Sequence, residues 1–204
     1  MAAEAGTVHQ PFLYDATQEE LEEFLLLGLF VAGKNAIVQQ RKLHWFLERL
    51  REHVLRSQAD WFPMQRISAL QPESLEQHLR YCGAGQYRRL VPALLWLSEK
   101  IPHGELNLKT CTRDELCACP GIGYKTASFF LIYTRRDATH ACLDTHILRW
   151  LREECGHENV PKSSPQGKKQ YEKWEQIYLA EAEKLGENPT TLDFELWLKY
   201  SKKN

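Results

Sequence analysis

The sequence has no apolar run long enough to cross a membrane. The longest, at residues 24–32 (FLLLGLFVA), is far shorter than the ~20 residues that a membrane-spanning helix needs. No Lys or Arg precedes Lys34, so the N-terminus lacks the charged start of a secretory signal. Both absences argue against a membrane or exported protein. We expect a cytoplasmic protein, associated with the nucleoid or, in a eukaryote, nuclear.

Cysteine is present but lacks the spacing of a zinc site or a disulfide framework. Cys111, Cys117 and Cys119 lie close together, yet no second pair at zinc spacing follows them, and no histidine lies at ligand spacing. A chain of 204 residues with 43% hydrophobic residues does not need disulfides to hold its core. We therefore expect free thiols.

A strong positive charge is missing as well, since the net charge is −1. The charged residues are unevenly distributed along the chain. Residues 1–33 contain six Asp or Glu residues and no Lys or Arg, so residues 34–204 contain 26 basic and 21 acidic residues, a net charge of +5. This modest basic bias permits contact with phosphates without requiring it.

Sustained alternation of apolar and polar residues, the pattern of half-buried strands, is also absent. Apolar residues recur at helical spacing instead, and capping boxes at Thr17–Glu20 and Thr112–Glu115 mark two helix starts. Pro92 is expected to kink its helix or to displace the start of that helix. The chain is predicted to be all-α, with helices at about 17–32, 35–60, 72–81, 86–100, 112–118, 124–134, 143–154, 168–185 and 190–202.

The informative stretch is residues 119–149, CPGIGYKTASFFLIYTRRDATHACLDTHILR. Pro-Gly-Ile-Gly at 120–123 predicts a tight turn between two helices, and glycines there let a phosphate approach backbone amides. The dipole of the following helix adds attraction for an anion, while Ile122 would pack into the core. On this motif alone, DNA binding and an ordinary corner between helices are equal alternatives.

Lys125 and Asp144 favour chemistry at this turn. Lys125 falls in the first turn of a helix, where the dipole and partial burial favour a neutral amine that can attack an electrophilic carbon and form a Schiff base. Asp144 lies at the start of the next helix, so antiparallel helices would bring both side chains to one cleft. Taken singly, the alternatives are a surface lysine and a helix N-cap.

PGIGYKTA followed by LDTHILR resembles the signature of the helix-hairpin-helix (HhH-GPD) DNA glycosylase superfamily, which includes endonuclease III and the 8-oxoguanine glycosylases. The resemblance covers roughly residues 20–200. It implies Lys125 as nucleophile and Asp144 as catalytic carboxylate. It also implies a two-lobed helical fold with a central cleft, built as a single unit over 1–204. One lobe would span about 34–135, with the hairpin at 112–134, and the other about 17–33 and 136–204.

The resemblance implies DNA-binding roles for further residues. DNA-backbone contacts are expected at the hairpin residues Gly121, Ile122, Gly123 and Lys125. Carbonyl groups near Cys117, Cys119 and Ile122 are expected to hold a structural monovalent or divalent cation. Gap-filling or other DNA contacts are expected at Lys34, Asn35 and Arg88, with a helix N-cap as the equal alternative for Asn35.

Within the superfamily, KTASFFL, LDTHILRW and LDFELWLKY look most like the compact, cluster-free 8-oxoguanine glycosylases of the archaeal type. The resemblance makes Trp197, Lys199, Tyr200 and Phe129 candidates for the base pocket, although Trp197 alternatively seals the C-terminal helix to the core. Only Cys155 follows Asp144, whereas an iron-sulfur cluster of the endonuclease III type needs four cysteines there. No cluster and no required cofactor are therefore expected.

The resulting functional hypothesis is a bifunctional DNA glycosylase and abasic-site lyase. It would act as a monomer on double-stranded DNA that carries a lesion, with 8-oxoguanine as the expected base. The alternatives are a glycosylase for an oxidised pyrimidine or a mismatched or modified base, and a non-enzymatic hairpin module that binds DNA. The LDTHILR segment argues against the module, because DNA binding alone does not need Lys125 paired with Asp144.

Overall fold

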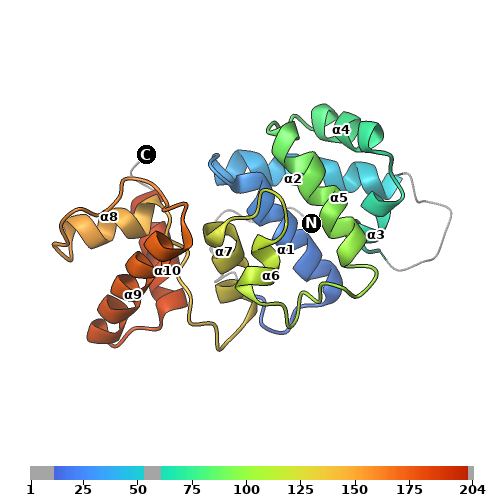
Figure 1. The fold of residues 1–204 in the computed structure, drawn as a ribbon. Helices are drawn as coiled ribbons and strands as arrows, with labels where there is room; N and C mark the ends of the chain where they lie inside the picture. Colours follow the sequence, from blue (N-terminus) through green and yellow to red (C-terminus); the bar gives the residue numbers. More distant parts are fainter. Residues whose placement is uncertain (1–11, 53–60, 202–204) are drawn as a thin grey trace, which may run out of the picture.

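The computed structural model describes residues 12–52 and 61–201, and within these ranges it contains helices and no strands. The prediction of an all-α protein is confirmed. Figure 1 shows two groups of helices joined by the chain that follows α7. The helices are α1 (Gln18–Val31), α2 (Ala36–Glu52), α3 (Pro63–Ser68), α4 (Pro72–Tyr81), α5 (Tyr87–Lys100), α6 (Arg113–Cys117), α7 (Tyr124–Thr134), α8 (Thr145–Glu153), α9 (Lys168–Leu185) and α10 (Pro189–Ser201).

Local sequence signals account for most helix starts. In both predicted capping boxes the Thr hydroxyl accepts from the Glu amide while the Glu carboxylate accepts from the Thr amide, at Thr17–Glu20 and at Thr112–Glu115. Prolines occupy the first turns of α3 and α4, where a missing amide proton costs nothing. Pro92 lies inside α5, whose start at Tyr87 agrees with the expected one.

Two elements differ from the prediction. The short helix α3 was not expected, and α2 ends at Glu52. The rest of the expected helix at 35–60 falls largely on residues 53–60, which lie outside the described residues. No helix in the described ranges is both long and apolar enough to cross a bilayer.

The buried side chains form two cores. The larger core is formed by helices α1 through α7, and the smaller core by α8, α9 and α10 (Figure 1). Residues 17–33 were predicted to belong to the lobe of the C-terminal helices, but α1 belongs to the larger core. Leu25 and Leu29 of α1 are fully buried in the larger core, where α1 packs on α2 and α7. An apolar helix face shows that a helix is buried but not against which partner.

Two buried contacts join the cores. Arg113 of α6 donates to Glu175 of α9 at 2.5 Å, and Glu175 is 3% exposed. Tyr133 of α7 donates its hydroxyl proton to Asp193 of α10 at 2.6 Å. These contacts fix the C-terminal helices against the hairpin helices, and the candidate site lies at this junction.

Candidate active site

The predicted hairpin is present between α6 and α7. Gly121 has a φ of +84°, a conformation that side chains other than glycine rarely adopt, and Gly123 is the N-cap of α7. Ile122 is buried in the larger core, and its amide donates to the carbonyl of Cys119 at 3.1 Å. The turn therefore exposes Gly121 and Gly123 while Ile122 anchors it from inside.

Arg89 of α5 clamps this hairpin, a role that the sequence analysis missed. Its guanidinium donates to the carbonyl of Leu29 at 2.6 Å and to the carbonyl of Gly121 at 3.3 Å, and its Nε donates to the side chain of Gln86 at 2.7 Å. The clamp joins the end of α1 to the hairpin. The neighbouring Arg88, which was the predicted DNA contact, is exposed and makes none of these contacts.

Lys125 lies in the first turn of α7 and is half-buried. It lines a hollow of about 290 Å³ between the hairpin and the loop that precedes α9. The hairpin side is formed by Gly121, Gly123 and Thr126, and the loop side by residues 164–166. Lys125 is thus accessible from the face on which the hairpin glycines are exposed.

Asp144 is the N-cap of α8, so this alternative for the residue holds. Its Oδ1 accepts from the amides of His146 at 2.8 Å and Ile147 at 3.0 Å. These two bonds occupy one carboxylate oxygen and fix the orientation of the group. The remaining oxygen, Oδ2, has no hydrogen-bond partner among the described residues.

The segment before Asp144 is held by α9. The hydroxyl of Tyr171 donates to the carbonyl of Ala141 at 2.7 Å and accepts from the amide of Leu143 at 3.0 Å. Glu175 accepts from the amide of Ala141 at 3.0 Å. Because both groups are buried, the backbone that carries Asp144 is fixed from the smaller core.

Lys125 and Asp144 both lie near enough to the buried carboxyl group of Asp193 for their charges to shift its pKa. Burial, with the nearby Asp144 carboxylate, raises the pKa of Asp193 to about 8, while the Tyr133 hydrogen bond and the charge of Lys125 oppose this rise. The thiol of Cys142 is fully buried in the same place. Burial, Asp193 and Asp144 raise its pKa well above the ordinary value, and Lys125 opposes them. The predicted lysine and carboxylate therefore share one region at the junction of the two cores.

Solved structures of DNA glycosylases have the same architecture. The 8-oxoguanine glycosylase/lyase of Methanocaldococcus jannaschii, in complex with DNA containing 8-oxoguanine, matches with a TM-score of 0.67 and 22% identity over 92% of this chain and 84% of that one. The 8-oxoguanine DNA glycosylase of Thermotoga maritima matches with a TM-score of 0.65 and 24% identity over 91% and 82%. The chain has a helix-hairpin-helix glycosylase fold.

The fold extends to a glycosylase with another substrate. The H. pylori 3-methyladenine DNA glycosylase bound to 1,N6-ethenoadenine matches with a TM-score of 0.59 and 20% identity over 93% of this chain and 87% of that one. No family model and no curated protein sequence matches the chain. At these identities the likeness establishes the glycosylase fold.

The predicted gap-filling residues lie at the break between α1 and α2 of the glycosylase fold. Both are exposed. The amine of Lys34 donates to the carbonyl of Ala84 at 3.3 Å, and Asn35 accepts from the amide of Val38 at 3.1 Å. Asn35 thus acts as the N-cap of α2, and its role toward DNA stays a prediction.

The four base-pocket candidates do not form one cluster. Phe129 stacks on Phe24 of α1, with ring centroids 4.9 Å apart, and Trp197 stacks on Phe194 at 6.3 Å. Lys199 and Tyr200 both contact the carboxylate of Glu154 at the end of α8. None of the four lines the Lys125 hollow among the described residues.

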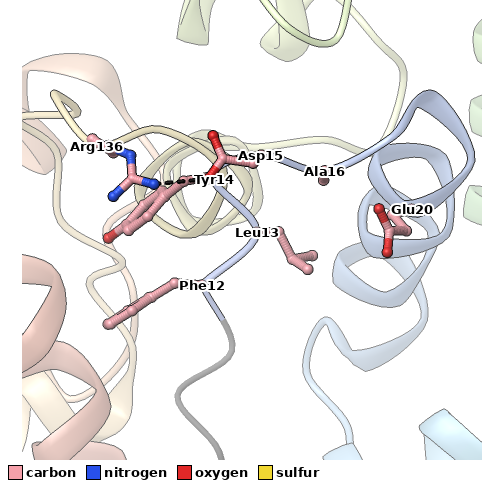
Figure 2. A pocket seen from close by; sticks show the side chains of 7 residues that line it. All are labelled: Phe12, Leu13, Tyr14, Asp15, Ala16, Glu20 and Arg136. Atoms are coloured by element: carbon pink, nitrogen blue, oxygen red, sulfur yellow. Dashed lines mark hydrogen bonds and ion pairs between the residues drawn. The ribbon is translucent and has the colours of Figure 1, made fainter.

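A second hollow, of about 270 Å³, lies where the N-terminal segment meets Arg136. Figure 2 shows Arg136 pairing with Asp15 above the ring of Tyr14, with Phe12 beside them. This hollow shares no described lining residue with the Lys125 hollow and contains none of the predicted site residues.

Proposed function

We propose that the chain is a DNA glycosylase with abasic-site lyase activity, in which Lys125 is the nucleophile and Asp144 the catalytic carboxylate. One observation carries the proposal: Lys125 and Asp144 both lie near enough to the buried carboxyl group of Asp193 for their charges to shift its pKa, which brings the amine and the carboxylate to the junction beside the hairpin. A corner between helices would not need an amine and an acid at one point. The glycosylase fold supports the same interpretation.

The reaction follows from these two groups. Once Lys125 has lost a proton to solvent, its Nζ forms a bond with C1′ of a flipped nucleotide while the bond from C1′ to the base breaks, and the electron pair of the broken bond leaves with the base. Asp144 stabilises the positive charge that develops on the sugar. The sugar ring then opens to a Schiff base. Loss of a proton from C2′ breaks the bond from C3′ to its oxygen and cuts the strand.

The hairpin is proposed to hold the DNA backbone. Gly121 and Gly123 expose their backbone at the start of α7, where the helix dipole attracts a phosphate. The carbonyl groups of Cys117 and Ile122 accept no hydrogen bond among the described residues, and that of Cys119 accepts one. These oxygens suit a structural cation, which would bridge the turn to a phosphate. Lys34, Asn35 and Arg88 would contact DNA beside the hairpin.

The expected substrate is 8-oxoguanine in double-stranded DNA, bound by a monomer. Of the three matching structures described above, two are 8-oxoguanine glycosylases and one is a 3-methyladenine glycosylase. A panel of duplexes carrying 8-oxoguanine, an oxidised pyrimidine, a mismatched thymine or an abasic site tests the substrate. Preferential release of 8-oxoguanine supports the assignment, and preference for another base replaces it.

Borohydride trapping on an abasic-site duplex tests the chemistry. Wild type should form a covalent adduct, and Lys125→Gln should form none. The matched control is Lys184→Gln in the last turn of α9, which removes the same charge from an exposed residue and should trap like wild type. Adduct formation by Lys125→Gln at the wild-type level would remove Lys125 as nucleophile. Duplex binding with neither trapping nor base release in wild type would indicate a non-enzymatic DNA-binding module.

A further inference from the structure

A second carboxyl group, Asp193, lies at the proposed site and has no part in the chemistry described above. Asp193 belongs to the first turns of α10, is 8% exposed, and accepts the hydroxyl proton of Tyr133 through Oδ2. Its other oxygen, Oδ1, has no hydrogen-bond partner among the described residues. The residue is therefore fixed through one oxygen and open at the other.

The groups around Asp193 come from every helix packed there. α7 contributes Lys125 and Tyr133, the start of α8 contributes Asp144, the segment before it contributes Cys142, and α9 contributes Tyr178. Lys125 is the single cation among them, and no ion pair between Lys125 and Asp193 forms within the described residues. Burial therefore dominates, and it keeps Asp193 protonated at neutral pH.

The two carboxyl groups of the site thus have different environments. Asp144 is half-exposed, and two backbone amides at a helix N-terminus bind its Oδ1, an arrangement that suits a carboxylate. Asp193 is buried and receives a single hydrogen bond, from Tyr133. When two acids near one reaction centre differ in this way, one can work as the charged group and the other as the proton donor.

We propose that Asp193 is the acid that protonates the departing base. The proposal rests on the proposed glycosylase function and adds a third residue to it. Because Tyr133 occupies Oδ2, the proton of Asp193 resides on Oδ1, the open oxygen. Trp197, four residues later, lies on the same face of α10 and is half-buried. A base that contacts Trp197 would therefore come within reach of Asp193.

The proton balance closes within the site. As the bond from C1′ to the base breaks, its electron pair goes to the base, and the Oδ1 proton of Asp193 neutralises the base. Lys125 becomes bonded to C1′ and carries an extra proton, which the Asp193 carboxylate then accepts. The acid is restored and no outside co-reactant is needed. An abasic site has no base to release, so Schiff-base formation there does not need the step in which Asp193 donates its proton to a base.

The test compares two substrates with one variant, Asp193→Asn, which keeps the shape of the side chain and removes the acid. Single-turnover release of base from an 8-oxoguanine duplex should fall by about 10²-fold or more, the usual contribution of a general acid. Trapping on an abasic-site duplex should fall far less, because no base has to be protonated there. Unchanged base release, or an equal loss on both substrates, would overturn the proposal. Failure of wild type to trap on the abasic site and to release any base would instead overturn the glycosylase function itself.

The pH profile separates an acid from a structural residue. Base release by wild type should fall as the pH rises through about 8, where Asp193 loses its proton, and Asp193→Asn should lack this fall. Tyr133→Phe keeps the acid and removes a hydrogen bond that lowers its pKa, so its fall should move to higher pH. Profiles of the same shape in all three proteins would overturn the proposal.

Discussion

The two hairpin glycines allow a matched pair of substitutions, Gly121→Ala and Gly123→Ala, that separates folding from DNA binding. A Cβ atom at Gly121 would lie 2.6 Å from Cγ of Arg89 and 3.5 Å from its carbonyl oxygen, at a φ of +84°. A Cβ atom at Gly123 meets nothing within 4 Å, and its φ of −102° is ordinary. Each substitution therefore adds one methyl group to the same turn, and this group points at Arg89 in Gly121→Ala and into open space in Gly123→Ala.

The expected stability losses differ strongly. At Gly121 the left-handed backbone costs about 1–2 kcal/mol with a Cβ atom. Displacing the Arg89 side chain adds about 1–3 kcal/mol, the usual cost of overpacking, so we expect a total of about 2–4 kcal/mol. At Gly123 alanine is a poorer N-cap, but it also restricts the unfolded chain, which offsets the loss by about 0.4–1 kcal/mol. The net change there should be close to zero.

Urea denaturation measures the change in stability, and duplex binding at fixed salt measures the change in affinity for DNA. Gly121→Ala should lower the denaturation midpoint with an unchanged slope, and part of its cost should disappear in an Arg89→Ala background. Gly123→Ala should fold like wild type and bind duplex about tenfold more weakly or worse, because its methyl group blocks an amide that would bind a phosphate. Equal stability losses would refute the steric argument, and wild-type affinity in Gly123→Ala would refute the hairpin as the DNA contact.

Two further predictions concern buried acids. Glu175→Ala leaves Arg113 without its 2.5 Å partner and the amide of Ala141 without an acceptor. Urea denaturation should therefore show a loss of about 3–5 kcal/mol in the free energy of unfolding. A loss below about 1 kcal/mol, the level of a surface ion pair, would contradict this prediction. The folded-state pKa of Asp193 is about 8, above the ~3.9 of an unfolded chain, so its stabilising contribution is complete below the lower value and is lost as the pH rises to the upper one. Wild type should therefore lose stability relative to Asp193→Asn between pH 4 and 8, and a constant difference in denaturation midpoint would exclude this titration.

Local signals predicted the helices and the turn because their causes are local. A capping box needs four consecutive residues, and both boxes form as predicted at Thr17 and Thr112. Helices α4 and α9 have the predicted bounds. The helix α3 was missed because six residues are too few to show a helical period. The predicted assignment of residues 17–33 to the C-terminal lobe was wrong, because periodicity identifies a buried helix face without identifying the element against which it packs.

The choice between Arg88 and Arg89 shows a second limit. The two residues are adjacent, so the rotation of α5 decides which one faces the hairpin. That rotation is set at Gln86, which has a φ of +52° although it is not a glycine. Glutamine gives no sequence signal for a left-handed conformation. Its side chain stabilises the arrangement by accepting from Arg89 and donating to the carbonyl of Ala32.

Asp193 shows which part of the site chemistry could not be predicted from the sequence. Lys125 and Asp144 could be proposed from the sequence because each belongs to a short motif whose local geometry bears on its role: a lysine after a glycine turn and an aspartate before a helix. The acid strength of Asp193 has no local cause. It comes from burial between α7 and α10 and from the aspartate at the N-cap of α8, while the same residue on an exposed helix face would be an ordinary carboxylate. A proton donor of this kind can be recognised only in the folded structure, where Tyr133 and Asp144 lie near Asp193.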